Sequence, residues 1–511
     1  MKQLKADFCV VGAGYAGLAA AYQLQKKHSV IVLEAGGHPG GRVWTELLSD
    51  GTPFDIGGAW VANEEVQPHV RALMRALNVE PYRQFTQSLE GKTIFVGSDG
   101  KVSYYRPLSE EHPEEALPKF GISAQLDVGS AIFALCAMSD SVNAEAPWED
   151  VTFELPMSLV GPQTTREADT MSVQTWMDLN MCSPDAQTLL EGAITGVLGV
   201  SPAAASLLHF LFMLKTFESK LPNIVGLGFA KNFMKMIGSG KGEAEEFRVR
   251  GGAQAMAKKI AELLGDNLYL RNPVRQITQD ARGVTVSSES VSVRARRVIV
   301  ATGTAMANFI RFDPVLPPAR ALLQQRMPQG EVWKIWLCYD QAWWRAKTLG
   351  LNGESVSIYA PDFVANSRDA GLGPGEDRPG LMNAFVAGDR ARELAAMGRA
   401  RRKKLVLKEM AHRFGDRALR LSKKITFPAI LPQNPEPDAY FEWNWAQDEF
   451  TRGDYAAVPG PGVLTAYGFG PARREPFRNV HWASVDLATY PYASFSGAIQ
   501  SGEAAAREVM G

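Results

Sequence analysis

The sequence of 511 residues contains few cysteines and histidines, and their spacing matches neither a metal site nor a disulfide scaffold. Its four cysteines lie far apart without a CxxC pair, and its seven histidines form no HxxxH pattern. Structural zinc sites and disulfide-rich secreted domains need such closely spaced ligands. The sequence therefore predicts that the thiols are reduced and that the protein is cytoplasmic, and it predicts no metal site.

Long hydrophobic runs and an excess of one charge sign are also missing. The longest apolar run after the N-terminal segment, residues 207–214, is interrupted by His209, whereas a membrane span needs about 20 apolar residues. The 54 Lys and Arg residues balance 55 Asp and Glu residues, which leaves a net charge of −1. These features argue against a signal peptide, a membrane anchor and nucleic acid as a partner. A large globular protein of two or three domains is expected.

The N-terminal segment contains a glycine-rich turn between a predicted strand and a predicted helix. Strands are expected at Phe8–Val11 and Val30–Leu33, with a helix at residues 18–26. The turn itself, residues 12–17, reads GAGYAG. A GxGxxG turn in this context is typical of dinucleotide binding, because the helix N-terminus presents free N–H groups to phosphate. The sequence therefore predicts a Rossmann-like cofactor domain.

Each residue of this fingerprint has a physical role. Gly12 permits the tight turn, Gly14 lets the backbone approach a pyrophosphate, and Gly17 lets the helix pack on the strand. Glu34, at the end of the second strand, can accept hydrogen bonds from ribose hydroxyls. NAD and FAD both fit this pattern. Two further glycine pairs and Arg42 suit an extended cofactor whose phosphates need neutralising, although ordinary loop glycines would look the same.

The motifs GAGYAGLAAA, VLEA, GGRV and DIGGAW follow one another in residues 12–60 and resemble those of the flavin-containing amine oxidases. Residues 269–277 resemble the family's strand beside adenine, and residues 327–345 resemble its lysine-bearing strand. The match extends over almost the whole chain, and among the subfamilies the monoamine oxidases look most similar. FAD is therefore the implied cofactor. Together, the fingerprint and the resemblance predict FAD contacts at Gly12, Gly14, Ala16, Gly17, Glu34, Ala35, Gly41, Arg42, Gly57, Gly58, Ala59, Trp60, Val274, Trp445, Asp486 and Phe495.

The resemblance implies an α/β (mixed α+β) chain with the amine oxidase, glutathione-reductase-like fold. In it, a Rossmann-like FAD-binding domain made of residues 1–85, 245–315 and 447–511 is interleaved with a substrate-binding domain made of residues 86–244 and 316–446. Prolines and glycines in residues 361–380 predict a loop. The sequence leaves the oligomeric state open, and a homodimer is compatible with it.

Lys334 is the most informative polar side chain of the second domain, because it lies inside the apolar strand predicted for Val332–Tyr339. A buried ammonium must find a partner or lose its proton. The resemblance implies a catalytic role for Lys334: the matching lysine holds a water beside flavin N5 and assists the reaction with oxygen. A snorkelling lysine on an edge strand is the alternative.

The resemblance also implies an aromatic cage for the substrate amine. Tyr455 matches one of its two walls and counts as catalytic and substrate-binding, with a core tyrosine as the alternative. Ser494 replaces the second tyrosine, so the pocket is wider or a neighbour such as Tyr492 supplies the wall. Asp454 replaces the cysteine that links FAD in some members, which predicts non-covalent FAD. Ser484 replaces a glycine near the phosphates and puts the local cofactor geometry in question.

The implied reaction is oxidation of a primary or secondary amine, with a hydrophobic or aromatic monoamine favoured. Hydride passes to flavin N5, the imine hydrolyses, and O2 reoxidises the flavin to give hydrogen peroxide. Three alternatives remain. An L-amino-acid oxidase needs an arginine for the carboxylate, and Ala59-Trp60 stand where one is common, so another would have to come from the substrate domain. A dehydrogenase with a protein acceptor and a non-catalytic binding module are the others.

Overall fold

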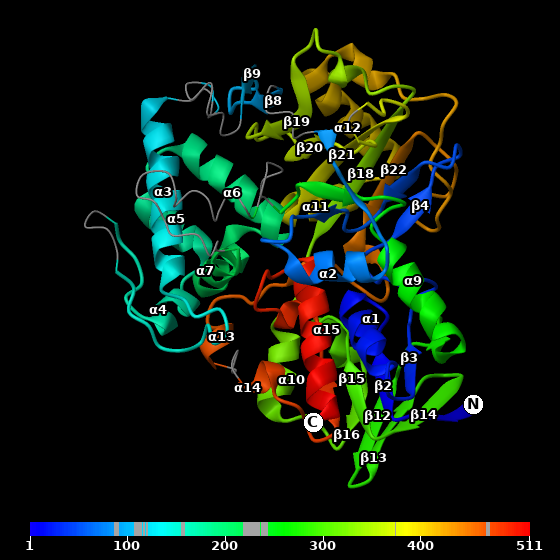
Figure 1. Cartoon of the computed structure of the whole chain (residues 1–511). Coiled ribbons are helices and arrows are strands. Elements are labelled where there is room, and N and C mark those ends of the chain that lie inside the picture. The colour runs from blue at the N-terminus through cyan, green and yellow to red at the C-terminus, as the bar shows by residue number, and fades with distance from the viewer. Residues whose placement is uncertain are drawn as a thin grey trace.

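Two large sheets of different character organise the chain (Figure 1). The computed structural model describes residues 1–85, 91–106, 115, 118, 121–154, 159–217, 236, 244–373, 375–466 and 471–511. Helices α1 (Tyr15–Leu24) and α15 (Phe495–Met510) lie side by side against the parallel sheet, which is described next. The result is a mixed α/β fold in which distant parts of the chain share one layer.

The first sheet has five parallel strands, in the order β11-β3-β2-β15-β24. Its strands are β11 (Leu268–Tyr269), β3 (Val30–Leu33), β2 (Phe8–Val11), β15 (Arg297–Val300) and β24 (Val480–Trp482). The strands β2 and β3 are buried along their whole length, as expected where helices cover a parallel sheet. Three stretches of chain, far apart in sequence, thus meet in one layer.

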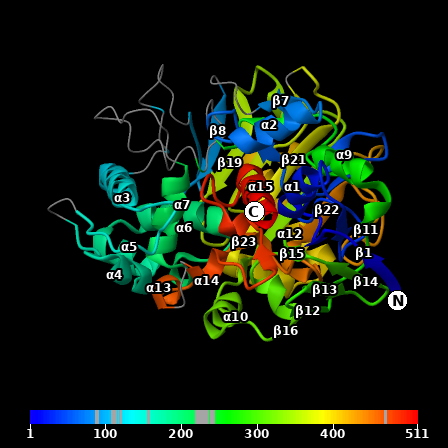
Figure 2. The same cartoon turned by 60° about the horizontal axis from the view of Figure 1, so that its bottom comes forward.

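A second five-stranded sheet, of mixed direction, includes the N-terminal strand at its edge and has the order β1-β14-β13-β12-β16 (Figure 2). Its strands are β1 (Lys2–Lys5), β14 (Val291–Ala295), β13 (Gly283–Ser287), β12 (Gln276–Asp280) and β16 (Arg311–Asp313). The single strand predicted over residues 269–277 is wrong, because β11 ends at Tyr269 and β12 begins at Gln276. Between them the Arg271 N–H donates to Gly36 O at 2.9 Å, and this turns the chain toward the end of β3.

The second large sheet has seven strands, in the order β22-β18-β21-β20-β19-β8-β9, and only β19 and β8 run parallel. Its strands are β22 (Tyr440–Asn444), β18 (Val332–Tyr339), β21 (Gly380–Ala387), β20 (Asn366–Asp369), β19 (Leu351–Ser357), β8 (Lys92–Val96) and β9 (Val102–Tyr105). The predicted strand Val332–Tyr339 is confirmed as β18. The loop predicted for residues 361–380 is wrong in part, because the polar segment Asn366–Asp369 pairs with β21 as β20.

A layer of helices packs at one side of the molecule, at the left of Figure 1. Its members are α3 (Ile122–Asp140), α4 (Thr165–Thr170), α5 (Val173–Asn180), α6 (Pro184–Leu198) and α7 (Leu207–Thr216). Among the described residues, α3 alone is long and apolar enough to cross a membrane, and 44% of its apolar stretch is buried inside the structure. Core helices meet the same criterion. The α7 helix, which is buried almost throughout, forms the centre of this layer.

The remaining elements complete these layers. The helices are α2 (Pro68–Ala76), α9 (Ala255–Leu264), α10 (Pro318–Gln325), α11 (Gly388–Ala395), α12 (Arg399–Phe414), α13 (Val463–Ala466) and α14 (Pro471–Arg474). The strands are β4 (Thr45–Leu47), β5 (Pro53–Asp55), β6 (Trp60–Val61), β7 (Pro81–Arg83), β10 (Phe247–Val249), β17 (Gln329–Gly330) and β23 (Asp454–Ala457). Short pairings such as β17 with β23 bring the C-terminal part of the chain beside the seven-stranded sheet.

Candidate active site

The glycine-rich turn after β2 has the shape that a bound dinucleotide requires. Gly12 has a φ of +101°, and a Cβ on Gly17 would lie 2.0 Å from the Gly12 carbonyl oxygen. Gly14 is the N-cap of α1, and a Cβ placed there would meet nothing within 4 Å. Gly17 is therefore needed for packing, whereas Gly14 leaves open space at a helix N-terminus. This is where the helix dipole and free N–H groups favour a phosphate.

The end of β3 presents Glu34 beside this turn. Its carboxylate accepts hydrogen bonds from Ala13 N at 2.5 Å and Gly36 N at 2.6 Å. Burial raises the pKa of Glu34, and these two N–H donors oppose that shift. Asn272 N donates to Glu34 O at 2.7 Å, which brings the loop containing the buried Val274 to the same edge. The residues predicted for the ribose and adenine end thus share one edge, and they fit that half of FAD.

Arg42 points toward the middle of the site. Its guanidinium donates to Tyr455 O at 2.6 Å and to Gln329 Oε1 at 2.9 Å. The preceding Gly41 has a φ of +59°, and its Cβ position lies 3.3 Å from Gly14 Cα. Arg42, which is predicted to bind phosphate, therefore also connects the glycine-rich turn with the strand that contains Tyr455.

The second glycine pair is shaped by aromatic side chains of the protein itself. A Cβ on Gly57 would lie 1.8 Å from the Arg42 carbonyl oxygen and 3.0 Å from Trp445 Cζ2, and a Cβ on Gly58 would lie 2.4 Å from Phe495 Cε1. Trp445 is buried, and the indole Nε1 has no hydrogen-bond partner among the described residues. The structure thus brings these two predicted cofactor contacts and the Gly57-Gly58 backbone together.

Lys334 lies at the centre of the site, on a strand that is paired on both sides. The edge-strand alternative is therefore excluded, and the residue is only 4% exposed. Its ammonium donates to Gly57 O at 2.7 Å and lies 4.9 Å from the centre of the Trp60 ring. Burial, assisted by the positive charge of Arg248, lowers the pKa of Lys334 to about 7, while Asp55 and Asp454 limit the shift. At neutral pH this amine can exchange a proton with little cost.

An aromatic surface faces Lys334. Tyr455 and Trp60 both pack against the buried side chains of Val332, Phe385 and Ala387. The Trp60 and Phe385 ring centres are 5.9 Å apart. Sequence reasoning assigned Trp60 to the cofactor and missed Phe385, which lies opposite Lys334 in the β18–β21 register. The apolar run of residues in β21 is the sequence feature that could have indicated Phe385.

Asp454 immediately precedes Tyr455 and is buried beside two positive charges. Burial raises the pKa of Asp454 to about 6, while Arg42 and Lys334 oppose the shift. The structure therefore places a titratable carboxyl, and no thiol, at the position where a cysteine could link FAD. This agrees with a non-covalent site.

Two predicted substrate contacts have other partners. Tyr492 donates its hydroxyl to Ala457 O at 2.9 Å, and its ring packs 5.2 Å from that of His209, inside the helical layer. Ser494 caps α15, because its hydroxyl accepts from Gly497 N at 3.0 Å and donates to Pro491 O at 2.8 Å. Neither side chain joins the aromatic surface around Tyr455.

Asp486 and Ser484 fix the segment that leads to α15. The Asp486 carboxylate accepts from Thr304 N at 2.7 Å and from Ala457 N at 2.8 Å. Burial raises the pKa of Asp486, but Arg42 and the two N–H donors outweigh it, and the net pKa lies below its usual value. Ser484 adopts extended backbone and accepts a hydrogen bond from Asp486 N at 3.1 Å. The local backbone therefore accommodates serine in place of glycine.

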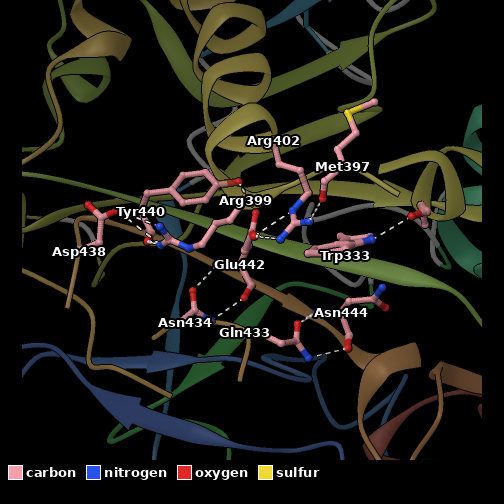
Figure 3. Close-up of polar contacts among 11 residues, drawn as sticks. Trp333, Met397, Arg399, Arg402, Gln433, Asn434, Asp438, Tyr440, Glu442 and Asn444 are labelled. Atoms are coloured by element: carbon pink, nitrogen blue, oxygen red, sulfur yellow. Dashed lines mark hydrogen bonds and ion pairs between the residues drawn. The ribbon is translucent and has the colours of Figure 1, made fainter. Parts of the chain in front are cut away.

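A polar network joins β22 to helix α12 (Figure 3). The fully buried Glu442 accepts hydrogen bonds from Arg402 Nε at 2.9 Å and from the Tyr440 hydroxyl at 2.7 Å. At the end of β22, the Asn444 side chain caps the turn that contains Trp445, by accepting from Ala446 N at 2.9 Å. This network holds Trp445 beside Gly57.

Comparisons with known proteins identify the family. The chain is 30% identical to an L-amino acid dehydrogenase of Synechocystis sp. over 508 residues, which covers 99% of this chain and 95% of the relative. It is 27% identical to a putrescine oxidase of Kocuria rosea, with 99% and 96% covered. A solved cyclohexylamine oxidase of Brevibacterium oxydans IH-35A has a TM-score of 0.80 at 26% identity, with 99% and 98% covered.

The family model described as flavin containing amine oxidoreductase matches residues 15–510. The cofactor of this family is FAD, and the glycine turn, Glu34 and the open space at Gly14 fit that group. The resemblance read from the sequence, the fold class and the enzymatic nature of the protein are thus confirmed. The chain belongs to the flavin-containing amine oxidoreductases.

Proposed function

We propose that this protein oxidises a primary or secondary amine borne on a hydrophobic or aromatic group. The observation that supports it is the buried Lys334, with a pKa lowered to about 7 by burial, next to the aromatic surface of Trp60, Phe385 and Tyr455. Such a surface favours an apolar amine, first as a cation over the rings and then as the neutral base. A scaffold for binding alone would not need a lysine that loses its proton so easily.

The residues of the chain divide the work. The glycine turn and Glu34 would hold the dinucleotide, while Trp60 and Tyr455 would orient the amine and exclude water. Bound FAD supplies the hydride acceptor and passes the electrons on to O2, which gives hydrogen peroxide. Lys334 would hold a water molecule near Gly57 O and exchange a proton with it during the oxidation by O2. Because Asp454 stands where a linking cysteine could be, the FAD is proposed to be non-covalent.

The test is flavin absorbance under anaerobic conditions with a panel of apolar amines, followed by admission of air. Bleaching by an amine and recovery with one hydrogen peroxide per turnover are expected. Bleaching without recovery in air would instead indicate a dehydrogenase with a protein acceptor, an alternative favoured by the Synechocystis relative. A flavin that no amine bleaches would contradict the proposal. Acid precipitation should release the flavin into the supernatant if it is non-covalent.

A further inference from the structure

The substrate side of the site contains an arginine that the sequence did not single out. Arg368 lies on β20, and its guanidinium carbon is 5.8 Å from the centre of the Trp60 ring. Tyr455 packs against the same buried side chains as Trp60. A cation therefore lies beside the aromatic surface that the proposed function assigns to the amine.

Strand register places this arginine on the face that contains Lys334. Lys334 lies opposite Phe385, and Phe385 lies opposite Asn366. Because alternate residues of a strand share a face, Arg368 points to the same side as Asn366. Asn383 lies opposite Arg368, and its buried carboxamide has no hydrogen-bond partner among the described residues. Two polar groups that can donate hydrogen bonds are thus neighbours next to the proposed amine site.

A glutamate neutralises Arg368 in this structure. Arg368 forms an ion pair with Glu245, and the two side chains are 19% and 23% exposed. The backbone of Glu245 is held in place, since Gln84 Nε2 donates to Glu245 O at 2.7 Å and Gln84 Oε1 accepts from Trp60 Nε1 at 2.7 Å. A carboxylate is therefore already bound to this guanidinium beside Trp60, in a partly desolvated place where a planar arginine recognises carboxylates well.

We propose that Arg368 is the anchor for a carboxylate on the substrate, with Glu245 as the counter-ion that this carboxylate displaces. The substrate class is then an α-amino acid with an apolar side chain, which has one amino group on a hydrophobic body. This inference rests on the proposed amine oxidation and narrows it. A simple amine leaves the Arg368–Glu245 pair intact and gains nothing from it.

The decisive experiment compares L-phenylalanine with 2-phenylethylamine, which differ by one carboxylate. In the wild-type holoenzyme, kcat/KM is expected to be higher for L-phenylalanine. In Arg368→Met, that preference should fall roughly 10- to 100-fold, the loss typical of a charge-assisted hydrogen bond. The ratio of the two kcat/KM values is therefore the quantity compared, because 2-phenylethylamine has no carboxylate to lose. Arg368→Lys, which keeps the charge, should retain part of the preference.

Arg250 offers a matched control, because it has the same kinds of neighbour as Arg368. It too is paired with a glutamate, Glu376, at 3.0 Å, and its guanidinium carbon is 4.8 Å from the centre of the Tyr82 ring. Arg250→Met should therefore leave the substrate preference unchanged. Equal losses for both substrates in Arg368→Met would indicate a merely structural role and would overturn the inference.

Anion binding gives a second readout that does not depend on turnover. Benzoate added to the holoenzyme should perturb the flavin spectrum, and Glu245→Gln should bind it more tightly because the competing carboxylate is gone. No perturbation by benzoate in the wild type or in Glu245→Gln would contradict the carboxylate anchor. Oxidation of 2-phenylethylamine at least as efficient as that of L-phenylalanine would sink this inference alone. A flavin bleached by neither compound nor by other apolar amines would sink the proposed function as well.

Discussion

The five-stranded parallel sheet and the seven-stranded sheet contribute to the site in different ways. The parallel sheet contributes backbone, because Gly12, Gly14 and Gly17 shape the turn at the end of β2. The seven-stranded sheet contributes side chains, because Lys334 and Arg368 project from the paired strands β18 and β20. A turn depends on six consecutive residues, whereas a shared face depends on the pairing of strands far apart in sequence. The glycine-rich turn is thus local in the sequence, whereas the face that carries Lys334 is not.

The largest expected effect lies in the parallel sheet. Gly17→Ala places a Cβ 2.0 Å from the Gly12 carbonyl oxygen, so α1 cannot keep its position on β2. We expect a loss of more than about 3 kcal/mol in the free energy of unfolding, together with loss of bound flavin. Thermal melting and the flavin-to-protein absorbance ratio measure both.

Gly14→Ala is the matched control for this effect, because its Cβ meets nothing within 4 Å and its φ is −70°. The apoprotein should melt like the wild type, while FAD binds about tenfold more weakly since the methyl group enters the phosphate space. If the Gly17→Ala and Gly14→Ala apoproteins melted at the same temperature, close backbone packing at Gly17 would not determine the shape of the turn.

The next effect lies in the seven-stranded sheet and is chemical. Lys334→Met should slow flavin reoxidation by O2 by about 100-fold, because the group that exchanges the proton is lost. Anaerobic bleaching by substrate should change only a few-fold, and stopped-flow absorbance separates the two rates. Lys259→Met is the control, since Lys259 also donates to a backbone carbonyl, Leu77 O at 2.6 Å, but lies on α9. Equal reoxidation rates in Lys334→Met and the wild type would remove the role given to Lys334.

A smaller effect tests the charge of Lys334 through stability. Its pKa is about 7 in the folded protein, against 10.5 as its ordinary value, so the unfolded chain binds more protons between these two pH values. The free energy of unfolding of the wild type, relative to Lys334→Met, should therefore rise with pH from 7 to 10.5 and be constant below 7. The slope is at most about 1.4 kcal/mol per pH unit. Chemical denaturation at several pH values measures it, and a flat difference would contradict the burial of a titrating amine.

Asp454 should show the opposite sign over a narrower range. Its folded pKa of about 6 lies above the ordinary 3.8, so the folded protein binds more protons than the unfolded chain between these values. The wild type should lose stability relative to Asp454→Asn as pH rises from 3.8 to 6, with no further change above 6. The same denaturation series measures this difference. A gain of wild-type stability over that range would mean that Asp454 is stabilised as a carboxylate.

The two sheets also differ in how much of their contribution to the site could be predicted from the sequence. The glycine-rich turn could be predicted because Gly12, Gly17 and Glu34 contact neighbours within one βαβ unit. Lys334 could be predicted because a lysine in an apolar strand is conspicuous. Its partner Gly57 O could not be predicted, because the contact joins residues 277 positions apart.

Other parts of the site depend on contacts that no local sequence pattern marks. The polar segment Asn366–Asp369 has no apolar alternation, so nothing local marks it as the strand that brings Arg368 to the site. The substrate contacts of Ser494 and Tyr492 stay predictions, and in this structure their hydroxyls bond to Pro491 O and Ala457 O. Capping and core packing of this kind depend on tertiary contacts that a motif does not contain.

The order in which the parallel sheet is filled also has a consequence for biosynthesis. Its strand β15 lies between β2, near the N-terminus, and the edge strand β24, which includes residues 480–482. At about 5–20 residues per second, a ribosome needs on the order of tens of seconds between making β2 and making β24. During that interval one side of β15 lacks its neighbouring strand, and α1 lacks the covering helix α15. Nascent chains should therefore depend on chaperones until α15 emerges, and early FAD capture should favour their survival.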